Sequence, residues 1–148
     1  CQQLIAESLG KKNKGFLPMI SNVPKDHHSL LQLYLDGPKD KIFNIFSLER
    51  SLKEKINIKN LINNINFLNK RKLSSVKDAQ KKALIKIFTK KNNLFREFKV
   101  KSNSEQVLGK LFSYFIIETV IIGRISKINP FDQPAVEQVK VYTKKLLK

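Results

Sequence analysis

The apolar run Ile42-Phe43-Asn44-Ile45-Phe46 is typical of a β-strand that is covered on both faces. A second strand is predicted from Leu94 to Val100. Between these two runs, apolar residues recur at the three- and four-residue spacing of amphipathic helices. Because strands that alternate with helices favour a parallel sheet between helical layers, the sequence predicts an α/β fold.

Two amphipathic helices are predicted between the strands. Their apolar stripes are Ile58, Leu61, Ile62, Ile65 and Leu68 in the first, and Ala79, Ala83, Leu84, Ile87 and Phe88 in the second. Ser75 followed by Asp78 has the spacing of a capping pair, so we expect the second helix to begin there. The basic and polar segment 69–77 is expected to form an exposed turn.

Shorter elements precede the first strand. Residues 1–9 are expected to end a helix, with Gly10 as its stop. Residues 15–20 are predicted to form a strand, although Pro18 restricts it to an edge or irregular position. A short helix is expected over residues 27–35, before a Gly-Pro pair.

The most apolar helix is predicted over residues 105–125. Ser102 with Glu105 has capping spacing at its start, and apolar residues lie nearly all round it, so we expect it to be buried. Its most apolar part, residues 111–122, is shorter than a membrane span and contains Glu118. We therefore expect no membrane partner.

Length and composition point to one cytoplasmic domain. The chain has 148 residues, enough for a single core. It has one cysteine and so no internal disulfide, which fits a reducing cytoplasm. Its start at Cys1, with no initiator methionine, suggests an excised fragment or a processed product. No His or Cys cluster has metal-ligand spacing, and no Gly-rich phosphate loop is present, so we expect neither metal nor cofactor.

The charge of the chain suggests an alternative function. A formal net charge of +17 is typical of nucleic-acid-binding proteins. However, lysines far outnumber arginines and are scattered in pairs, and lysine lacks the planar fork that reads bases. Charge alone supports only non-specific binding. A lysine-rich nucleic-acid-binding module is therefore the alternative, and a specific nucleic-acid partner is not expected.

The C-terminal segment NPFDQPAVEQVK (residues 129–140) places polar groups near a predicted helix start. Proline is favoured at the first helical position, so Pro134 is expected to open the helix. Gln133 then lies beside a helix N-terminus, where an anion is favoured, and Lys140 lies about two turns along. A capped amphipathic helix that merely packs through Val136, Val139, Thr143 and Leu146 has the same spacing.

Three blocks resemble the phosphoglucose isomerase (glucose-6-phosphate isomerase) family and occur in the same order along the chain as they do in that family. The segment 129–140 is similar to its F-D-Q-x-G/A-V-E-x-x-K pattern, and QQLIAESLGK (residues 2–11) to its Q-x-x-x-E-S-x-G-K block. HSLLQL (residues 28–33) is similar to its H-[AS]-x-x-Q-L segment. The resemblance implies a three-layer α/β/α sandwich with a mainly parallel sheet, a sugar isomerase-like domain covering residues 1–148.

The resemblance also implies roles for five residues. An aldose–ketose isomerase needs a base that moves a proton between C2 and C1, and groups that open the sugar ring. Glu7 matches the family's base, and Gln3 and Gln133 match glutamines that bind the substrate. His28 and Lys140 match the residues that open the ring. From the residues alone, Glu7 and His28 are more typical of solvated surface groups, and Lys140 of a lysine that extends outward.

Two departures from the family pattern qualify this reading. His27 stands beside His28, so either imidazole could act; we favour His28, placed at the start of a short helix whose dipole favours a neutral ring. The family's Ser/Thr-rich phosphate segment and its arginine after a Gly-Gly pair are missing. We therefore expect a C-terminal fragment, without the N-terminal half, that is inactive alone. The family also implies a homodimer in which His28 serves the neighbouring subunit's site, with glucose 6-phosphate and fructose 6-phosphate as substrates.

Overall fold

The computed structural model describes residues 1–49, 54–57 and 63–147. They form two compact units, Cys1–Ser21 with Ser104–Lys148 and Asn22–Asn103, and each is described by itself. The first unit contains helices α1 (Gln2–Leu9), α5 (Glu105–Ile125) and α6 (Pro134–Leu146). The second contains α2 (Lys25–Ser29), α3 (Leu31–Asp36), β1 (Ile42–Leu48), the 3₁₀ helix η1 (Asn63–Leu68), α4 (Leu73–Lys90) and β2 (Leu94–Val100).

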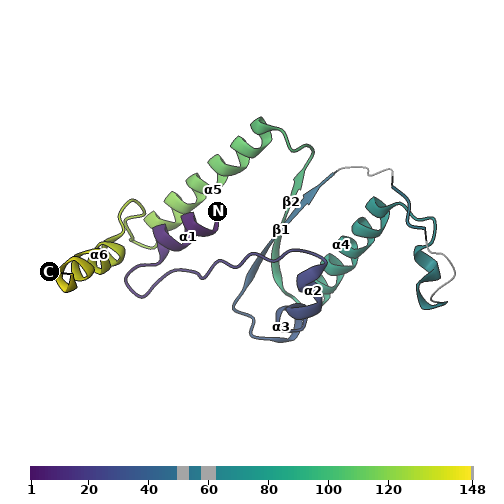
Figure 1. Cartoon of the computed structure of the whole chain (residues 1–148), viewed down its shortest axis with the longest axis horizontal. Helices are drawn as coiled ribbons and strands as arrows, with labels where there is room; N and C mark the ends of the chain where they lie inside the picture. The colour runs from purple at the N-terminus through teal and green to yellow at the C-terminus, as the bar shows by residue number, and fades with distance from the viewer. Residues whose placement is uncertain (50–53, 58–62, 148) are drawn as a thin grey trace. The chain divides into compact units, whose positions relative to one another are not determined.

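The second unit is built on a parallel pair of strands (Figure 1). β1 and β2 pair in parallel, with Ile42 opposite Leu94 and Leu48 opposite Val100. The long helix α4 connects them, as a parallel pair requires. The predicted α/β class and the predicted parallel pairing are therefore confirmed.

An aromatic cluster covers one face of this pair. Phe43 and Phe95 lie opposite each other on β1 and β2. The ring of Phe43 lies 4.6 Å from that of Phe88 in α4 and 5.2 Å from that of Tyr34 in α3. Phe88 is only 2% exposed, so it is the centre of this core.

The opposite face of the pair is open within the second unit. Phe46 and Phe98 stack there with ring centroids 4.9 Å apart, yet Phe46 remains 49% exposed. Ile42 and Leu94 are also more than half exposed. The expectation that both faces are covered is thus met on one face only, and the open face keeps the apolar character of a surface that packs against a further layer.

Replacing Phe88 by alanine is expected to lower the free energy of unfolding by about 3–5 kcal/mol, because it removes a buried ring and leaves a cavity. Urea unfolding followed by circular dichroism measures this change. Phe67→Ala is the matched control, since that ring is 70% exposed and its removal should change stability by less than about 0.5 kcal/mol. Equal losses in the two variants would contradict the assignment of Phe88 to the core.

Several local predictions are wrong in detail. Residues 15–20 form no strand; Pro18 lacks an N–H, and no described strand pairs with this segment. The helix predicted over residues 27–35 is instead two short helices, with a break at Leu30. The apolar stripe that began at Ile58 lies partly outside the described residues, and its described end is the 3₁₀ helix η1.

Two helix starts also differ from the predictions. α4 begins at Leu73, so only part of the predicted turn over residues 69–77 is a turn, and Ser75 lies inside the helix. α5 is capped by Ser104, whose Oγ accepts from the N–H of Val107 at 3.4 Å. Ser102 was the predicted cap, which is two residues too early.

The prediction that α5 is buried is correct on one side only. Phe115, Thr119 and Gly123 are buried, whereas Ile117 and Ile125 are more than half exposed. A helix of 21 residues is long and apolar enough to cross a membrane by length and composition, so judging residues 111–122 alone underestimated its length. Core helices of soluble proteins pass the same test, and this one helix is weak grounds for a membrane span.

Candidate active site

The first unit is held together by the packing of α1 on α5 (Figure 1). Leu9, in the last turn of α1, is 1% exposed, and Phe115 of α5 is 2% exposed. The hydroxyl of Thr119 is buried and donates to the carbonyl of Phe115 at 2.7 Å. Burial on this scale fixes the position of α1, and with it the position of Glu7.

The chain turns back sharply after α5. The N–H of Ile128 donates to the carbonyl of Gly123 at 2.8 Å, and Lys127 between them adopts a left-handed conformation with φ of 56°. A side chain at Gly123 would place its Cβ 3.2 Å from Pro130 Cβ. Glycine therefore allows the loop after α5 to pack closely against the end of that helix.

This loop brings Gln133 to Glu7. The side-chain amide of Gln133 donates to Glu7 Oε2 at 3.0 Å, across 126 residues of sequence. Gln3, one turn earlier in α1, donates to Glu7 Oε1 at 3.1 Å. Each oxygen of the half-buried carboxylate thus accepts one amide N–H, and the two amides orient it. Three of the five predicted site residues are in direct contact.

The start of α6 agrees with the prediction, but its packing does not. Pro134 occupies the first turn and Gln133 is the N-cap. However, no residue of α6 is buried: Val139 is 67% and Leu146 87% exposed. The prediction that an apolar stripe packs this helix onto the body of the chain is wrong, because no described element covers that stripe.

Lys140 lies on α6 and does not reach Glu7. Its ammonium group donates to Glu137 Oε1 of the same helix at 2.6 Å, and both side chains are about two-thirds exposed. Among the described residues it makes no hydrogen bond or ion pair with Glu7. An exposed pair of this kind is worth at most about 1 kcal/mol, so Lys140 is easily released to another partner.

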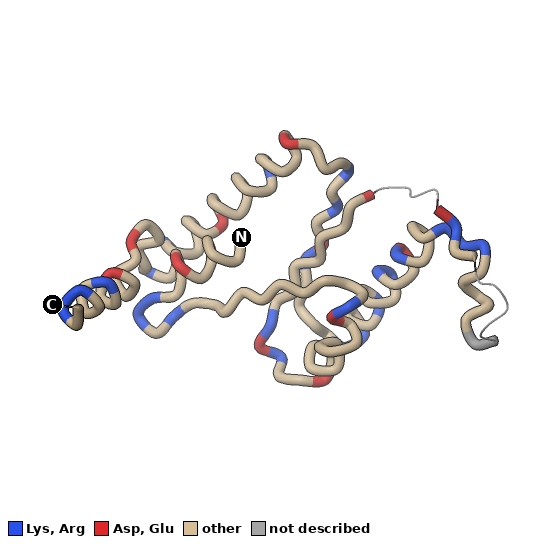
Figure 2. Tube along the Cα trace, in the orientation of Figure 1, with Lys and Arg blue, Asp and Glu red and all other residues tan. Residues whose placement is uncertain are grey.

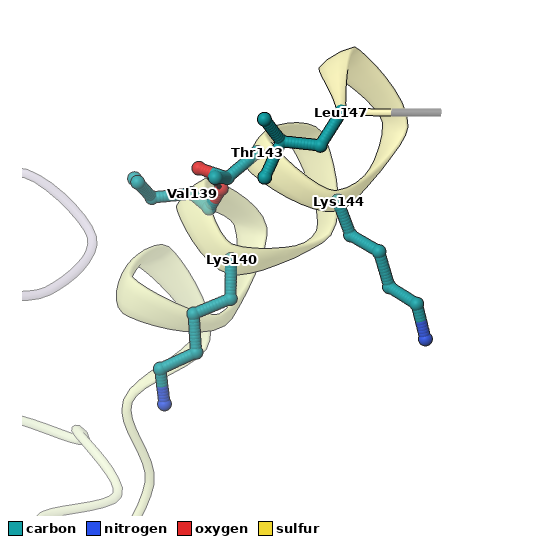
Figure 3. Close-up of a pocket in the computed structure, with 5 residues that line it drawn as sticks. All are labelled: Val139, Lys140, Thr143, Lys144 and Leu147. Carbon is teal, nitrogen blue, oxygen red and sulfur yellow. Dashed lines mark hydrogen bonds between the residues drawn. The ribbon is translucent and has the colours of Figure 1, made fainter.

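A shallow hollow along α6 includes Lys140. It is lined by Val139, Lys140, Thr143, Lys144 and Leu147. Figure 3 shows the two lysines extending from one side of the helix, whereas Val139, Thr143 and Leu147 lie along the other. Because residues of a single helix end line it, this hollow is open surface and does not enclose a ligand.

His28 belongs to the second unit. It lies in the last turn of α2, a helix of five residues, and its side chain is exposed. The prediction that it stands at a helix start is wrong, because the helix begins three residues earlier, at Lys25. Within the described part of the chain no residue bonds to its imidazole, and Glu7 and Lys140 belong to the first unit. His27 is less exposed.

Positive charge is spread over both units (Figure 2). In the first unit it lies just after α1, at Lys11, Lys12 and Lys14, and on α6, and in the second it runs along α4. Several of these lysines are engaged: Lys11 pairs with Asp132, and Lys81 lies 3.2 Å from Glu97. Dispersed and partly paired lysines favour general attraction of anions over a dedicated nucleic-acid surface. In the part of the chain that the structure describes, no three His, Cys, Asp or Glu side chains gather as metal ligands.

Comparison with solved structures places this arrangement in a known α/β fold. The chain superposes on the crystal structure of a hypothetical protein from Thermus thermophilus with a TM-score of 0.88 and 28% identity. The match covers 99% of this chain and 37% of that one. No family model matches the sequence.

The curated relatives define a class of enzyme, the isomerases. The chain is 33% identical to a protein of Methanocaldococcus jannaschii over 99% of its length, and 33% and 32% identical to proteins of Mycoplasmopsis synoviae and Lactobacillus helveticus over 94% and 95% of it. All three are named glucose-6-phosphate isomerase, so the resemblance to that family is confirmed. The chain spans about a third of their length, 36% of the first and 32% of the last.

Sequence reasoning missed the residues that hold the loop in place. Lys11, Asn129 and Asp132 are joined by hydrogen bonds, yet only their neighbours Glu7 and Gln133 were singled out. The signal was present, because Lys11 closes one motif and Asp132 lies inside another. Without a fold, nothing in the spacing says that the two motifs touch.

Proposed function

We propose that this chain is the part of a cytoplasmic glucose-6-phosphate isomerase that carries the base, and that it acts on glucose 6-phosphate and fructose 6-phosphate. The observation that supports this most is the carboxylate of Glu7, held by the amides of Gln3 and Gln133. Two motifs of the family, at opposite ends of the chain, meet at this one group. Electrostatic attraction from the net charge of +17 would draw the anionic substrate toward it.

Ring opening comes first in the proposed reaction. The bond between C1 and the ring oxygen breaks, the ring oxygen gains a proton, and the C1 hydroxyl loses one. His28 and Lys140 assist these transfers, for which an imidazole is suited near neutral pH. Lys140 must leave Glu137 to do so, which costs little for a pair this exposed.

Proton transfer follows in the open chain. Glu7 takes the proton from C2, which leaves a cis-enediol(ate), and returns it to C1, while the hydroxyl proton on O2 moves to O1. The product is the ketose, with no atom gained or lost. Gln3 and Gln133 serve both to aim the carboxylate and to bind sugar hydroxyls. No cofactor is needed for this transfer.

The 148-residue chain alone is expected to show no measurable turnover. Lys140 and the rest of α6 are not buried, and a site open to water lacks the positioned charges that stabilise an enediolate. A coupled assay that consumes glucose 6-phosphate as it forms from fructose 6-phosphate measures this. Substantial turnover by the purified chain, abolished by Glu7→Gln, would contradict the inactivity and still support Glu7 as the base.

A further inference from the structure

Lys11 joins the two motifs at a point next to the candidate base. Its side chain is only 10% exposed, which is unusual for lysine. The ammonium group donates to the carbonyl of Asn129 at 2.6 Å and to Asp132 Oδ1 at 2.8 Å, across 118 and 121 residues of sequence. A largely covered lysine whose ammonium group donates two of its three N–H groups to one loop fixes the position of that loop.

The loop is also fixed from within. Asn129 Nδ2 donates to the second oxygen of Asp132 at 3.0 Å, and Asn129 Oδ1 accepts from the N–H of Phe131 at 3.1 Å. Both oxygens of Asp132 are therefore engaged. We refer to Lys11, Asn129 and Asp132 as the Lys11 clasp. The hydrogen bond from Lys11 is the largest of the effects that hold the pKa of Asp132 below its ordinary value of 3.8.

The Lys11 clasp is close in sequence to both Gln133 and Glu7, the two residues of the contact at the proposed base. Gln133 directly follows Asp132, and Glu7 lies in the last turn of α1, four residues before Lys11 in the sequence. The bond of 3.0 Å between Gln133 Nε2 and Glu7 Oε2 thus closes a ring whose other side is the clasp. Because the clasp fixes residues 129–132, it restricts the positions that the side-chain amide of Gln133 can adopt.

We propose that Lys11 is a positioning residue, which holds the loop of residues 129–132 so that the amide of Gln133 orients the carboxylate of Glu7. Lys11 itself touches neither Glu7 nor the reacting atoms. Its effect on catalysis rests on the proposed function, whereas its effect on the Gln133–Glu7 contact does not.

The nearest alternative is a lysine that only stabilises the unit. Lys14 is of that kind, because it donates to the carbonyl of Ser126 at 3.0 Å, far along the loop from Gln133. A merely stabilising Lys11 would lower the free energy of unfolding when replaced and leave the Gln133 amide of the folded molecule unchanged. A positioning Lys11 changes that amide in molecules that remain folded.

The test compares Lys11→Met with Lys12→Met in the 148-residue chain. Methionine keeps the length of the side chain and removes the charge, and Lys12 is an exposed neighbour that serves as the matched control. Nitrogen-15 NMR follows the side-chain amide of Gln133, with the signals of α5 reporting that the chain is folded. We expect the Gln133 amide of Lys11→Met to shift toward the position of a free glutamine amide, because its hydrogen bond to Glu7 is lost. Lys12→Met should match the wild type, and Lys11→Arg should reverse part of the shift.

The titration of Asp132 provides a second reading. Its pKa is lowered in the folded chain, so the clasp is complete above pH 3.8 and is lost as the pH falls through the lowered value. Lys11→Met should move the Asp132 titration upward, and Lys12→Met should not. If Lys11→Met fails to fold, Asp132→Asn keeps the shape of the loop and removes the same ion pair. A Gln133 amide that is unchanged in folded Lys11→Met or Asp132→Asn overturns the proposal.

The enzyme assay separates this proposal from the proposed function. In the full-length enzyme that carries this chain, Lys11→Met should lower kcat by roughly 10–100-fold with little change in KM, because the base is misaimed while sugar binding persists. A full-length wild type without turnover refutes the proposed function and leaves the NMR result standing. A shifted Gln133 amide with unchanged kcat overturns the positioning role in catalysis.

Discussion

Glu7→Gln in the full-length enzyme is expected to lower kcat by about 10³-fold and to leave KM within about threefold of the wild type. The proposed reaction requires Glu7 to carry a proton from C2 to C1, and a positioned base contributes about 10²–10⁴-fold. Glutamine keeps the shape of the side chain and one carbonyl oxygen that accepts a hydrogen bond. The substrate should therefore still bind, and only the proton transfer should fail.

The measurement is a steady-state assay in both directions, with thermal unfolding as a check on folding. Glu49→Gln is the matched control, because Glu49 is an exposed carboxylate next to β1 and far in sequence from either motif. The control should keep wild-type kcat and KM. If Glu7→Gln retains kcat within about tenfold of the wild type, Glu7 is not the base.

The elements that sequence reasoning located best are those whose signal is local. The strand at Leu94–Val100 and the helix at Glu105–Ile125 have the predicted bounds, since alternation, helical periodicity and turn residues act within a few positions. The contact between Gln3 and Glu7 is of the same kind, because residues four apart share a helical face.

Burial was predicted less well, because it depends on whether another element covers the apolar side of a helix. α5 is apolar nearly all round, yet only a stripe through Phe115 and Thr119 is covered. α6 has a clear apolar side with Val139 in it, and none of its residues is buried. Periodicity tells which side of a helix should be covered, and it cannot tell whether the covering surface lies in the same 148 residues. The chain spans only 36% of the relative from Methanocaldococcus jannaschii.

In the candidate site, too, local features and long-range contacts differ in how well the sequence predicts them. The contact between Glu7 and Gln133 spans 126 residues, so spacing could not predict it. The resemblance assigned each of the two residues a role in the site, and the structure brings them within hydrogen-bond distance. The placement of His28 at a helix start was a local inference that was wrong, since Lys25 and Asp26 join the helix before its predicted start and His28 lies in its last turn.

Mixed dimers of His28→Ala and Glu7→Gln are expected to recover activity that neither variant has alone. If His28 of one subunit completes the site that contains the other subunit's Glu7, each mixed dimer holds one intact site and one doubly defective site. With random pairing, about half of the dimers are mixed, so about a quarter of wild-type turnover should return. The two full-length variants are denatured, mixed in equal amounts and refolded before the coupled assay.

A second pair of variants gives this experiment its control. Glu7 and Lys140 lie in the same unit and are proposed to act within one site. A mixture of Glu7→Gln with Lys140→Ala therefore places one defect in each site and should recover nothing. Failure of the His28 and Glu7 pair to recover, although mixed dimers form, would show that His28 acts within its own subunit. Recovery in both pairs would instead assign Lys140 to the neighbour's site together with His28, because only groups from different subunits can complement each other.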